Sequence, residues 1–167
     1  MKHYKFSSVI IPAACLIFLS GCSKNKTKEI VFDSTNLPSQ QELSRISSDF
    51  SDTVDIDFTN MSATMVYAEV FNMLIMPEEY EGKTIKAKGL FYVATDPITN
   101  NHYFSVIVQD ATACCQEGLE FVWQGEHKFP EDYPPEGSEI TVTGRFCKLE
   151  LEGGITYSFL NANKVEF

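Results

Sequence analysis

Apolar and polar residues alternate over most of the chain after Gly82, with the period of two that is typical of β-strands. Within residues 83–93, the apolar positions fall on one face and Lys86 and Lys88 on the other. The same alternation predicts four further strands at 102–109, 119–124, 140–151 and 155–167, the last with a break near Asn161. Turn residues at 96–101, prolines between 130 and 135, and a Gly-Gly pair at 153–154 separate them.

One helix is predicted before the strands, over residues 62–75. Asn60 or Ser62 would cap its start, and Pro77 would end it. The stripe expected to face the core is Met65, Ala68, Phe71 (or Asn72) and Ile75, with Leu74 beside it.

Glycines inside the first and fourth predicted strands indicate where the sheet coils sharply. Gly89 and Gly144 stand at these points. The segments 82–89 and 137–144 resemble the first and fourth strands of an OB-fold. This resemblance covers 82–167 and implies a mainly β fold, a five-stranded OB-like barrel preceded by one α-helix. OB-folds commonly have a helix between strands three and four. Prolines occupy that stretch here, so we expect the helix at 62–75 to close the barrel end instead.

The N-terminus has the pattern of an export signal. Lys2 and Lys5 precede an uncharged, largely apolar run from Ser7 to Cys22, which is shorter than the roughly 20 residues of a spanning helix. The run ends in Leu-Ser-Gly-Cys, which resembles the lipobox of bacterial lipoproteins. The resemblance implies cleavage before Cys22 and a lipid on its thiol. A plain secretory signal with an incidental cysteine is the alternative.

These patterns divide the chain into three parts: a lipoprotein signal peptide (1–21), a lipidated flexible linker (22–60), and a helix plus OB-like barrel domain (61–167). The linker is expected because Ser, Asp and Lys dominate it. Residues 54–58 alternate apolar and acidic side chains, and we favour the end of the linker over a short edge strand. Several acyl chains would hold the protein at the extracytoplasmic face of the cell membrane.

Composition and charge narrow the function. The 167 residues are 44% hydrophobic and 22% charged, which is typical of one globular domain. The net charge of −10 disfavours a nucleic-acid partner, because phosphate binding needs a basic face. No Gly-x-Ser-x-Gly or His-Glu-x-x-His motif occurs, so we expect a protein that is not an enzyme.

The cysteines indicate candidate chemistry rather than a disulfide framework. Of the five, Cys15 would leave with the signal and Cys22 would carry lipid. Cys114, Cys115 and Cys147 then remain, an odd number for an exported chain.

Cys114 and Cys115 lie together in the turn after the second strand, and three interpretations stand. Their thiolates bind zinc or copper(I), with Asp110 and Glu117 as further ligands and Cys147 as a doubtful one. Alternatively they form a vicinal disulfide that acts in redox chemistry, or they are small buried core groups. The turn resembles a vicinal-cysteine loop of uncharacterised exported OB-like bacterial proteins, some of which accompany a permease. This implies a transporter or another envelope protein as partner.

A second candidate site lies at the opposite end of the predicted barrel. His102 opens the second strand and His127 follows the third, so neither can share an ion with Cys114. With Glu150 or Glu152 they could form another site. Tyr92, Tyr103, Trp123 and Tyr157 are candidate ligand-binding rings at this end, near the loops 96–101 and 151–154.

The leading hypothesis is therefore a non-catalytic, membrane-anchored binding module that holds a metal ion, zinc or copper, on its vicinal cysteines in support of transport. The first alternative is an interaction module for a protein, a peptide or a glycan, with structural cysteines. The second alternative is a thiol-redox protein.

Overall fold

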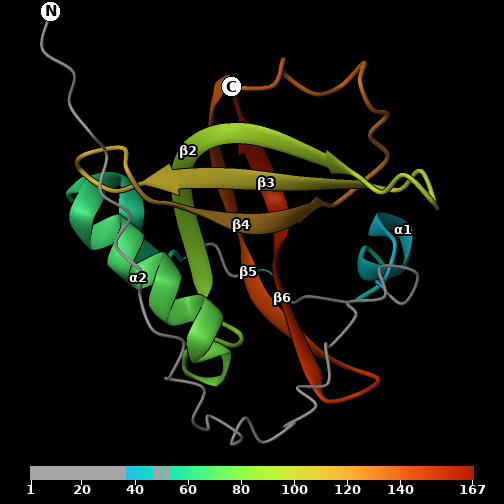
Figure 1. Cartoon of the computed structure of the whole chain (residues 1–167), viewed down its shortest axis with the longest axis horizontal. Coiled ribbons are helices and arrows are strands. Elements are labelled where there is room, and N and C mark those ends of the chain that lie inside the picture. Colours follow the sequence, from blue (N-terminus) through green and yellow to red (C-terminus); the bar gives the residue numbers. More distant parts are fainter. Residues whose placement is uncertain (1–36, 47–49, 51–52) are drawn as a thin grey trace, which may run out of the picture. The chain divides into compact units, whose positions relative to one another are not determined.

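Five strands close into a ring because each hydrogen-bonds to two neighbours. The computed structural model describes residues 37–46, 50 and 53–167. Around the ring, the strands follow one another as β2 (Thr84–Thr95), β3 (His102–Gln109), β4 (Gln116–Trp123), β6 (Ile155–Glu166) and β5 (Glu139–Leu151). β5 then pairs with β2, and of these five pairs around the ring only β4–β6 is parallel (Figure 1). The prediction of a mainly β fold with one main helix before these strands is confirmed.

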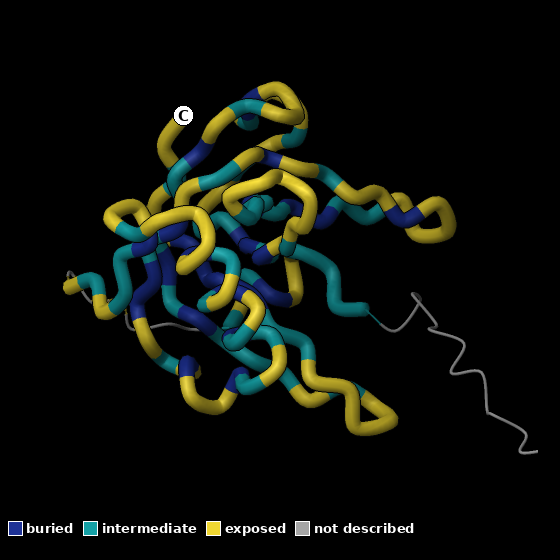
Figure 2. The backbone as a smooth tube through the Cα atoms, turned by 60° about the vertical axis from the view of Figure 1, so that its left-hand side comes forward, coloured by how far each residue is buried: buried dark blue, intermediate teal, exposed yellow. Residues whose placement is uncertain are grey.

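The core lies inside this ring. Side chains that alternate along the strands point inward, and the buried stretches of the tube gather there in Figure 2. Its largest members are the rings of Phe58, Phe91, Phe121 and Phe146, each at most 2% exposed. Among the described residues, no helix is long and apolar enough to cross a membrane.

Two glycines allow the strands to cross at close range. A Cβ on Gly89 would lie 2.2 Å from the Ile107 carbonyl oxygen, and one on Gly144 would lie 2.5 Å from the Asn161 carbonyl oxygen. The β5–β6 register shifts by one residue at Thr143/Gly144, which is the break that the sequence places near Asn161. No other residue type fits at either crossing without moving the backbone.

A sixth, short strand extends the sheet at one edge of the ring. β1 (Ile56–Asp57) pairs in parallel with β2, and the Thr84 N–H donates to the Asp55 carboxylate at 2.8 Å. The 3-10 helix η2 (Phe58–Asn60) follows, with Phe58 in the main core. Residues 54–58 therefore belong to the fold, and the interpretation as the end of the linker is wrong. The burial of Phe58 outweighs the acidic neighbours on which that interpretation relied.

The helix α2 (Ala63–Ile75) starts and ends where the sequence predicts. The Ser62 hydroxyl accepts from the Met65 N–H at 3.4 Å, and Pro77 opens the 3-10 helix η3 (Pro77–Glu79) directly afterwards. Val66, Val70 and Met73 enter the core of the ring. In Figure 1, α2 lies beside the end of the ring where β3 finishes.

The predicted core stripe of α2 is wrong. Met65, Phe71 and Ile75 are 55%, 43% and 56% exposed, and Ala68 is also exposed. The helix is apolar on two sides, so periodicity offers two stripes of similar strength. The position of the ring strands selects Val66, Val70 and Met73 instead.

Part of the predicted linker is folded against the outside of the ring. The short helix α1 (Gln40–Leu43) has a capping box between Ser39 and Glu42. Leu43 is fully buried against Val122 and Phe159, which alternate with inward-facing residues of β4 and β6. Such a burial stabilises by about 1.5–3 kcal/mol. One leucine in a polar stretch is too weak a signal to predict this packing. The predicted signal peptide, Cys22 and the predicted linker up to residue 36 lie outside the described residues.

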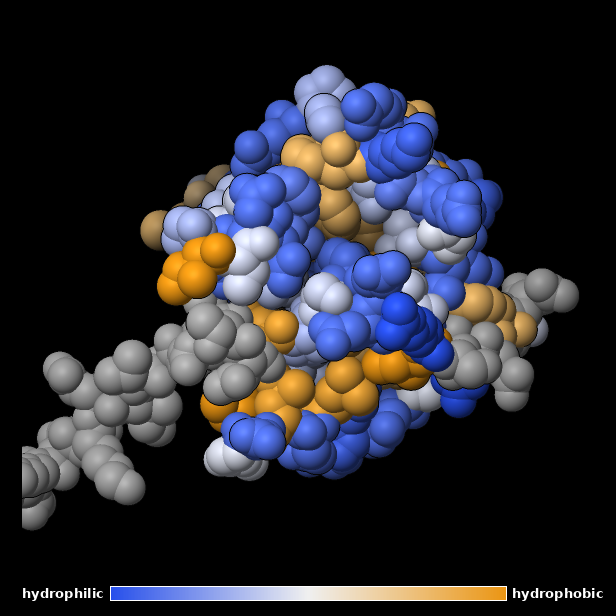
Figure 3. All heavy atoms as spheres, turned by 90° about the vertical axis from the view of Figure 1, so that its right-hand side faces the viewer, coloured by the Kyte–Doolittle hydropathy of each residue, from blue (hydrophilic) through white to orange (hydrophobic). Residues whose placement is uncertain are grey.

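The face that carries α1 retains apolar surface. It is turned to the viewer in Figure 3, where orange surface lies between polar side chains. The apolar cluster under α1 is separate from the main core and includes the partly buried Ile46, Cys147 and Leu149.

Two methionines of α2 provide a test of its orientation. Met73→Ala is expected to lower the free energy of unfolding by about 2–5 kcal/mol, because it leaves a cavity in the core. Met65→Ala is expected to change it by less than about 1 kcal/mol. Urea unfolding followed by circular dichroism measures both, and equal losses would contradict the orientation.

Candidate functional site

The turn between β3 and β4 presents two exposed thiols. Cys114 and Cys115 are unbonded and exposed, so they are not small buried core groups. The Asp110 carboxylate shapes this turn: it accepts from the Cys114 N–H at 2.9 Å and from the Thr112 N–H at 3.1 Å. Desolvation would raise the pKa of Asp110, but these hydrogen bonds outweigh it and lower the pKa. The carboxylate is thus engaged by the backbone of the turn.

The other predicted metal ligands are also engaged elsewhere. Glu117 accepts from the Tyr67 hydroxyl of α2 at 3.5 Å. Cys147 is half-buried in the cluster under α1, where burial raises the pKa of its thiol. Within residues 37–46, 50 and 53–167, no three His, Cys, Asp or Glu side chains are grouped to hold a metal ion.

Aromatic side chains gather at the opposite end of the ring, where β4 ends. The rings of Trp123 and His127 stack with centroids 3.6 Å apart and an interplanar angle of 11°. Phe129 and Tyr133 follow in the proline-rich segment, and His102 lies 4.8 Å from Phe129, centroid to centroid. Both histidines are therefore at the far end from Cys114, as the strand directions predict.

These rings form one wall of a hollow of about 400 Å³, which we call the aromatic hollow. Its aromatic and imidazole lining comes from Trp123, His127, Phe129 and Tyr133. The polar lining comes from Gln40 and Gln41 of α1, from Ser44 directly after α1, and from the charged residues Glu126 and Lys128. A few polar groups facing an aromatic wall are typical of small-ligand sites.

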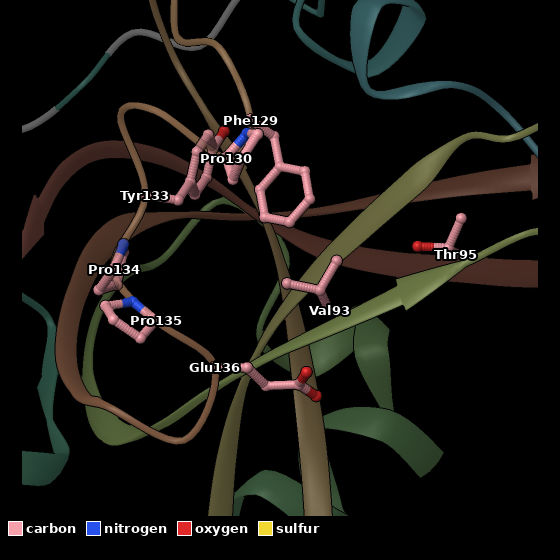
Figure 4. Close-up of a pocket in the computed structure, with 8 residues that line it drawn as sticks. All are labelled: Val93, Thr95, Phe129, Pro130, Tyr133, Pro134, Pro135 and Glu136. Atoms are coloured by element: carbon pink, nitrogen blue, oxygen red, sulfur yellow. The ribbon is translucent and has the colours of Figure 1, made fainter.

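A second hollow of about 390 Å³ adjoins the first, because Phe129 and Tyr133 line both. Figure 4 shows its two sides, with Val93 and Thr95 on β2 opposite the prolines 134 and 135. Glu136 is its only acidic lining residue.

Of the ligand-binding residues predicted, the structure places His127 and Trp123 in the aromatic hollow, whereas Tyr157 packs in the separate apolar cluster under α1. His102 reaches it only through its contact with Phe129. Tyr103 is 8% exposed, and desolvation raises the pKa of its hydroxyl. Tyr92 is exposed, but it lies with Leu90 and Ile107 in a different shallow hollow.

The predicted second site with Glu150 or Glu152 is not assembled. β6 runs parallel to β4 with Leu160 opposite Phe121, so the β5–β6 hairpin lies on the side where β4 begins. His127 follows the other end of β4. Glu150 instead accepts from the Thr156 hydroxyl at 3.1 Å.

Sequence reasoning missed the aromatic members Phe129 and Tyr133 and the whole contribution of α1. The prolines at 130, 134 and 135 suggested only broken structure, although an aromatic residue precedes two of them. This alternation of aromatic residues and prolines is the sequence signal that could have predicted the aromatic members of the site. Nothing in the local pattern indicated Gln40 or Gln41.

A partly buried carboxyl that accepts a hydrogen bond from α1 was also missed. Glu120 of β4 accepts a hydrogen bond from the Tyr157 hydroxyl and one from the Gln40 amide at 3.3 Å. Burial raises the pKa of Glu120 to about 7, although the Tyr157 hydrogen bond acts in the lowering direction. Among the described residues, Glu120 has no ion pair. Burial and the nearby Glu120 raise the pKa of Tyr157, which keeps it a donor.

No protein-family model matches the chain, and no curated protein sequence matches it.

Proposed function

We propose that the chain is a bacterial lipoprotein, held by a lipid on Cys22 at the extracytoplasmic face of the cell membrane. The charged start, the uncharged run and the Leu-Ser-Gly-Cys motif support this proposal. Only 14 residues separate Cys22 from the first described residue, Leu37. At about 3.6 Å per residue at most, a segment of this length reaches no further than about 50 Å, so the folded part would work near the membrane surface.

The anchor has a direct test. Cys22→Ser is expected to abolish incorporation of an alkyne-tagged palmitate analogue when the full chain is expressed in bacteria, because the acylated thiol is gone. Cys15→Ser, which changes a cysteine of the leader, is expected to retain it. Labelling that persists in the Cys22 variant would remove the lipoprotein assignment.

We further propose that the folded part is an OB-like barrel that binds a ligand without catalysing a reaction. The strand order of the ring supports the OB-like relationship, because OB-folds are five-stranded Greek-key barrels. The aromatic hollow carries the binding proposal, because its lining combines rings with amide and hydroxyl groups, beside one acidic and one basic residue, Glu126 and Lys128. We infer an uncharged glycan as the ligand class.

The chemistry of the lining supports a glycan over the other candidates. Aromatic faces pack against the C–H faces of sugar rings, and the polar groups of Gln40, Gln41 and Ser44 can exchange hydrogen bonds with hydroxyls. The net charge of −10 disfavours polyanions. The adjoining hollow gives room for a second sugar unit over the shared ring of Phe129.

Side chains of the aromatic hollow provide the test. Phe129→Ala and Gln41→Ala are each expected to weaken, by about tenfold, the binding of a neutral oligosaccharide selected on a glycan array, because a ring contact or a hydrogen bond is lost. Tyr92→Ala, an exposed ring outside the hollow, is the matched control and is expected to bind like the wild type. Isothermal titration calorimetry gives the dissociation constants. An array with peptide hits and no glycan hit would favour the peptide alternative.

A metal ion on the vicinal cysteines is the second candidate function. The exposure of both thiols in one tight turn favours it. Because Asp110 and Glu117 already accept hydrogen bonds within the protein, the two sulfurs would supply most of the affinity for the metal ion. That chemistry suits a soft ion such as copper(I), or zinc with ligands from a partner.

Native mass spectrometry of residues 23–167, purified anaerobically with zinc or copper(I), tests this function. One bound ion is expected, lost in the Cys114→Ser/Cys115→Ser variant and retained in Cys147→Ser, because Cys147 is packed under α1. A metal-free mass for the wild type and for both variants would exclude the metal function.

A further inference from the structure

The side of α2 that faces away from the core carries no charge. In Figure 1 the helix lies on the outside of the ring. Its exposed positions are all uncharged: Ala63, Thr64, Met65, Ala68, Phe71 and Ile75. The exposed fraction is 55% for Met65, 43% for Phe71 and 56% for Ile75. Since the outward side of such a helix normally carries charged and polar residues, this composition needs an explanation.

Four of these side chains form one continuous stripe, which we call the outer stripe. They are spaced three, three and four positions apart, in the order Met65, Ala68, Phe71 and Ile75. The side chains that α2 contributes to the core lie on its other side, so the fold does not use the outer stripe. A contiguous exposed apolar surface that the fold does not use is typical of an interaction site.

Carboxylates border the outer stripe. Residues 61–82 contain four glutamates and neither Lys nor Arg. Glu69 lies within α2, and the exposed Glu78 and Glu79 follow the helix in η3. On the side of the β3–β4 turn, Glu117 accepts from the Tyr67 hydroxyl of α2 at 3.5 Å. We call Glu69, Glu78, Glu79 and Glu117 the acidic rim.

The lysines near the end of α2 interact with other groups. The Lys83 ammonium lies over the Tyr80 ring, 5.0 Å from its centroid, and the Tyr80 hydroxyl donates to Glu69 at 2.9 Å. Lys148 lies 3.8 Å from Glu81, which is outside the rim. Among the described residues, the two glutamates of η3 have no ion pair. Their negative charge is thus available to a partner.

We propose that the outer stripe is the docking site for a basic amphipathic helix of a protein partner. The apolar side of that helix would pack on the stripe, as amphipathic helices do on apolar surfaces of their receptors. Lys or Arg residues along its borders would pair with the acidic rim. This inference is independent of the proposed function, because it involves neither the aromatic hollow nor Cys22, Cys114 or Cys115.

The charges favour a basic helix over two other occupants of the stripe. Helices that lie on a membrane surface carry Lys and Arg beside their apolar side, and residues 61–82 contain none. A second copy of the chain would bring two acidic rims together, because the same surface of both subunits meets in a twofold dimer. Like charges that face one another disfavour such an association.

Photo-crosslinking of the full chain, in the cells that produce it, tests the site. The photoreactive residue p-benzoylphenylalanine replaces Met65, Phe71 or Ile75, and the captured peptides are sequenced by mass spectrometry. We expect all three to capture one segment of another protein, with apolar residues at helical spacing and an excess of Lys and Arg. Positions 65 and 75 are about 15 Å apart along α2, so the residues they capture should lie about ten positions apart. The control position is Ile98, 73% exposed between β2 and β3, where only background capture is expected.

A charge reversal tests the acidic rim. Glu78→Lys is expected to lower the capture yield from position 71 by about threefold, because it places like charges opposite each other. Glu131→Lys, an exposed carboxylate after β4, changes the net charge equally and is expected to retain the yield. Both side chains are exposed, so both variants are expected to keep the wild-type melting temperature.

Several results would overturn the partner helix. Capture of lipid would assign the outer stripe to the membrane, and capture of a second copy would assign it to self-association. A yield from position 71 no higher than that from position 98 would remove the site, and a captured segment without basic residues would remove the role of the rim. None of these readouts depends on glycan, metal or lipid attachment, so the proposed function and this inference can fail separately.

Discussion

The long strand β2 holds the ring together, because it pairs with two different strands along its length. Its first half pairs with β5, and its second half pairs with β3, with the change at Leu90. Gly89 stands just before this point, where the Ile107 carbonyl oxygen leaves no room for a Cβ. Because β2 coils sharply there, its first half can pair with β5, and this pairing closes the ring. The core, the position of α2, and the two ends of the ring all depend on this bend.

The arrangement of the strands was predictable because alternation, glycine and turn residues agree in residues 82–167. The direction of each predicted strand also places the cysteine turn at the opposite end from His102 and His127, as the structure has it. The face of α2 was not predictable, since both of its apolar stripes have helical spacing. A choice between equal stripes is made by tertiary contacts, which a single sequence does not display.

The candidate site was predicted only in part for a related reason. Trp123 and His127 lie next to a predicted strand, so their place at the end of the ring followed from topology. Gln40 and Gln41 approach from a segment more than 80 residues earlier, which has one buried apolar side chain, Leu43. The same long-range contact covers Glu120, and neither a surface-like position in a strand nor a glutamate side chain indicates burial by itself.

The short strand β1 has a consequence for solubility. β3 pairs only with the second half of β2, so the first half would otherwise present unpaired backbone groups on that side. On that side β1 pairs with Ile85 and Lys86, and the Asp55 carboxylate accepts a hydrogen bond from the adjacent Thr84 N–H. An exposed edge is a template on which strands of other molecules can add. Two residues and one aspartate thus protect this edge of the sheet from intermolecular β-pairing.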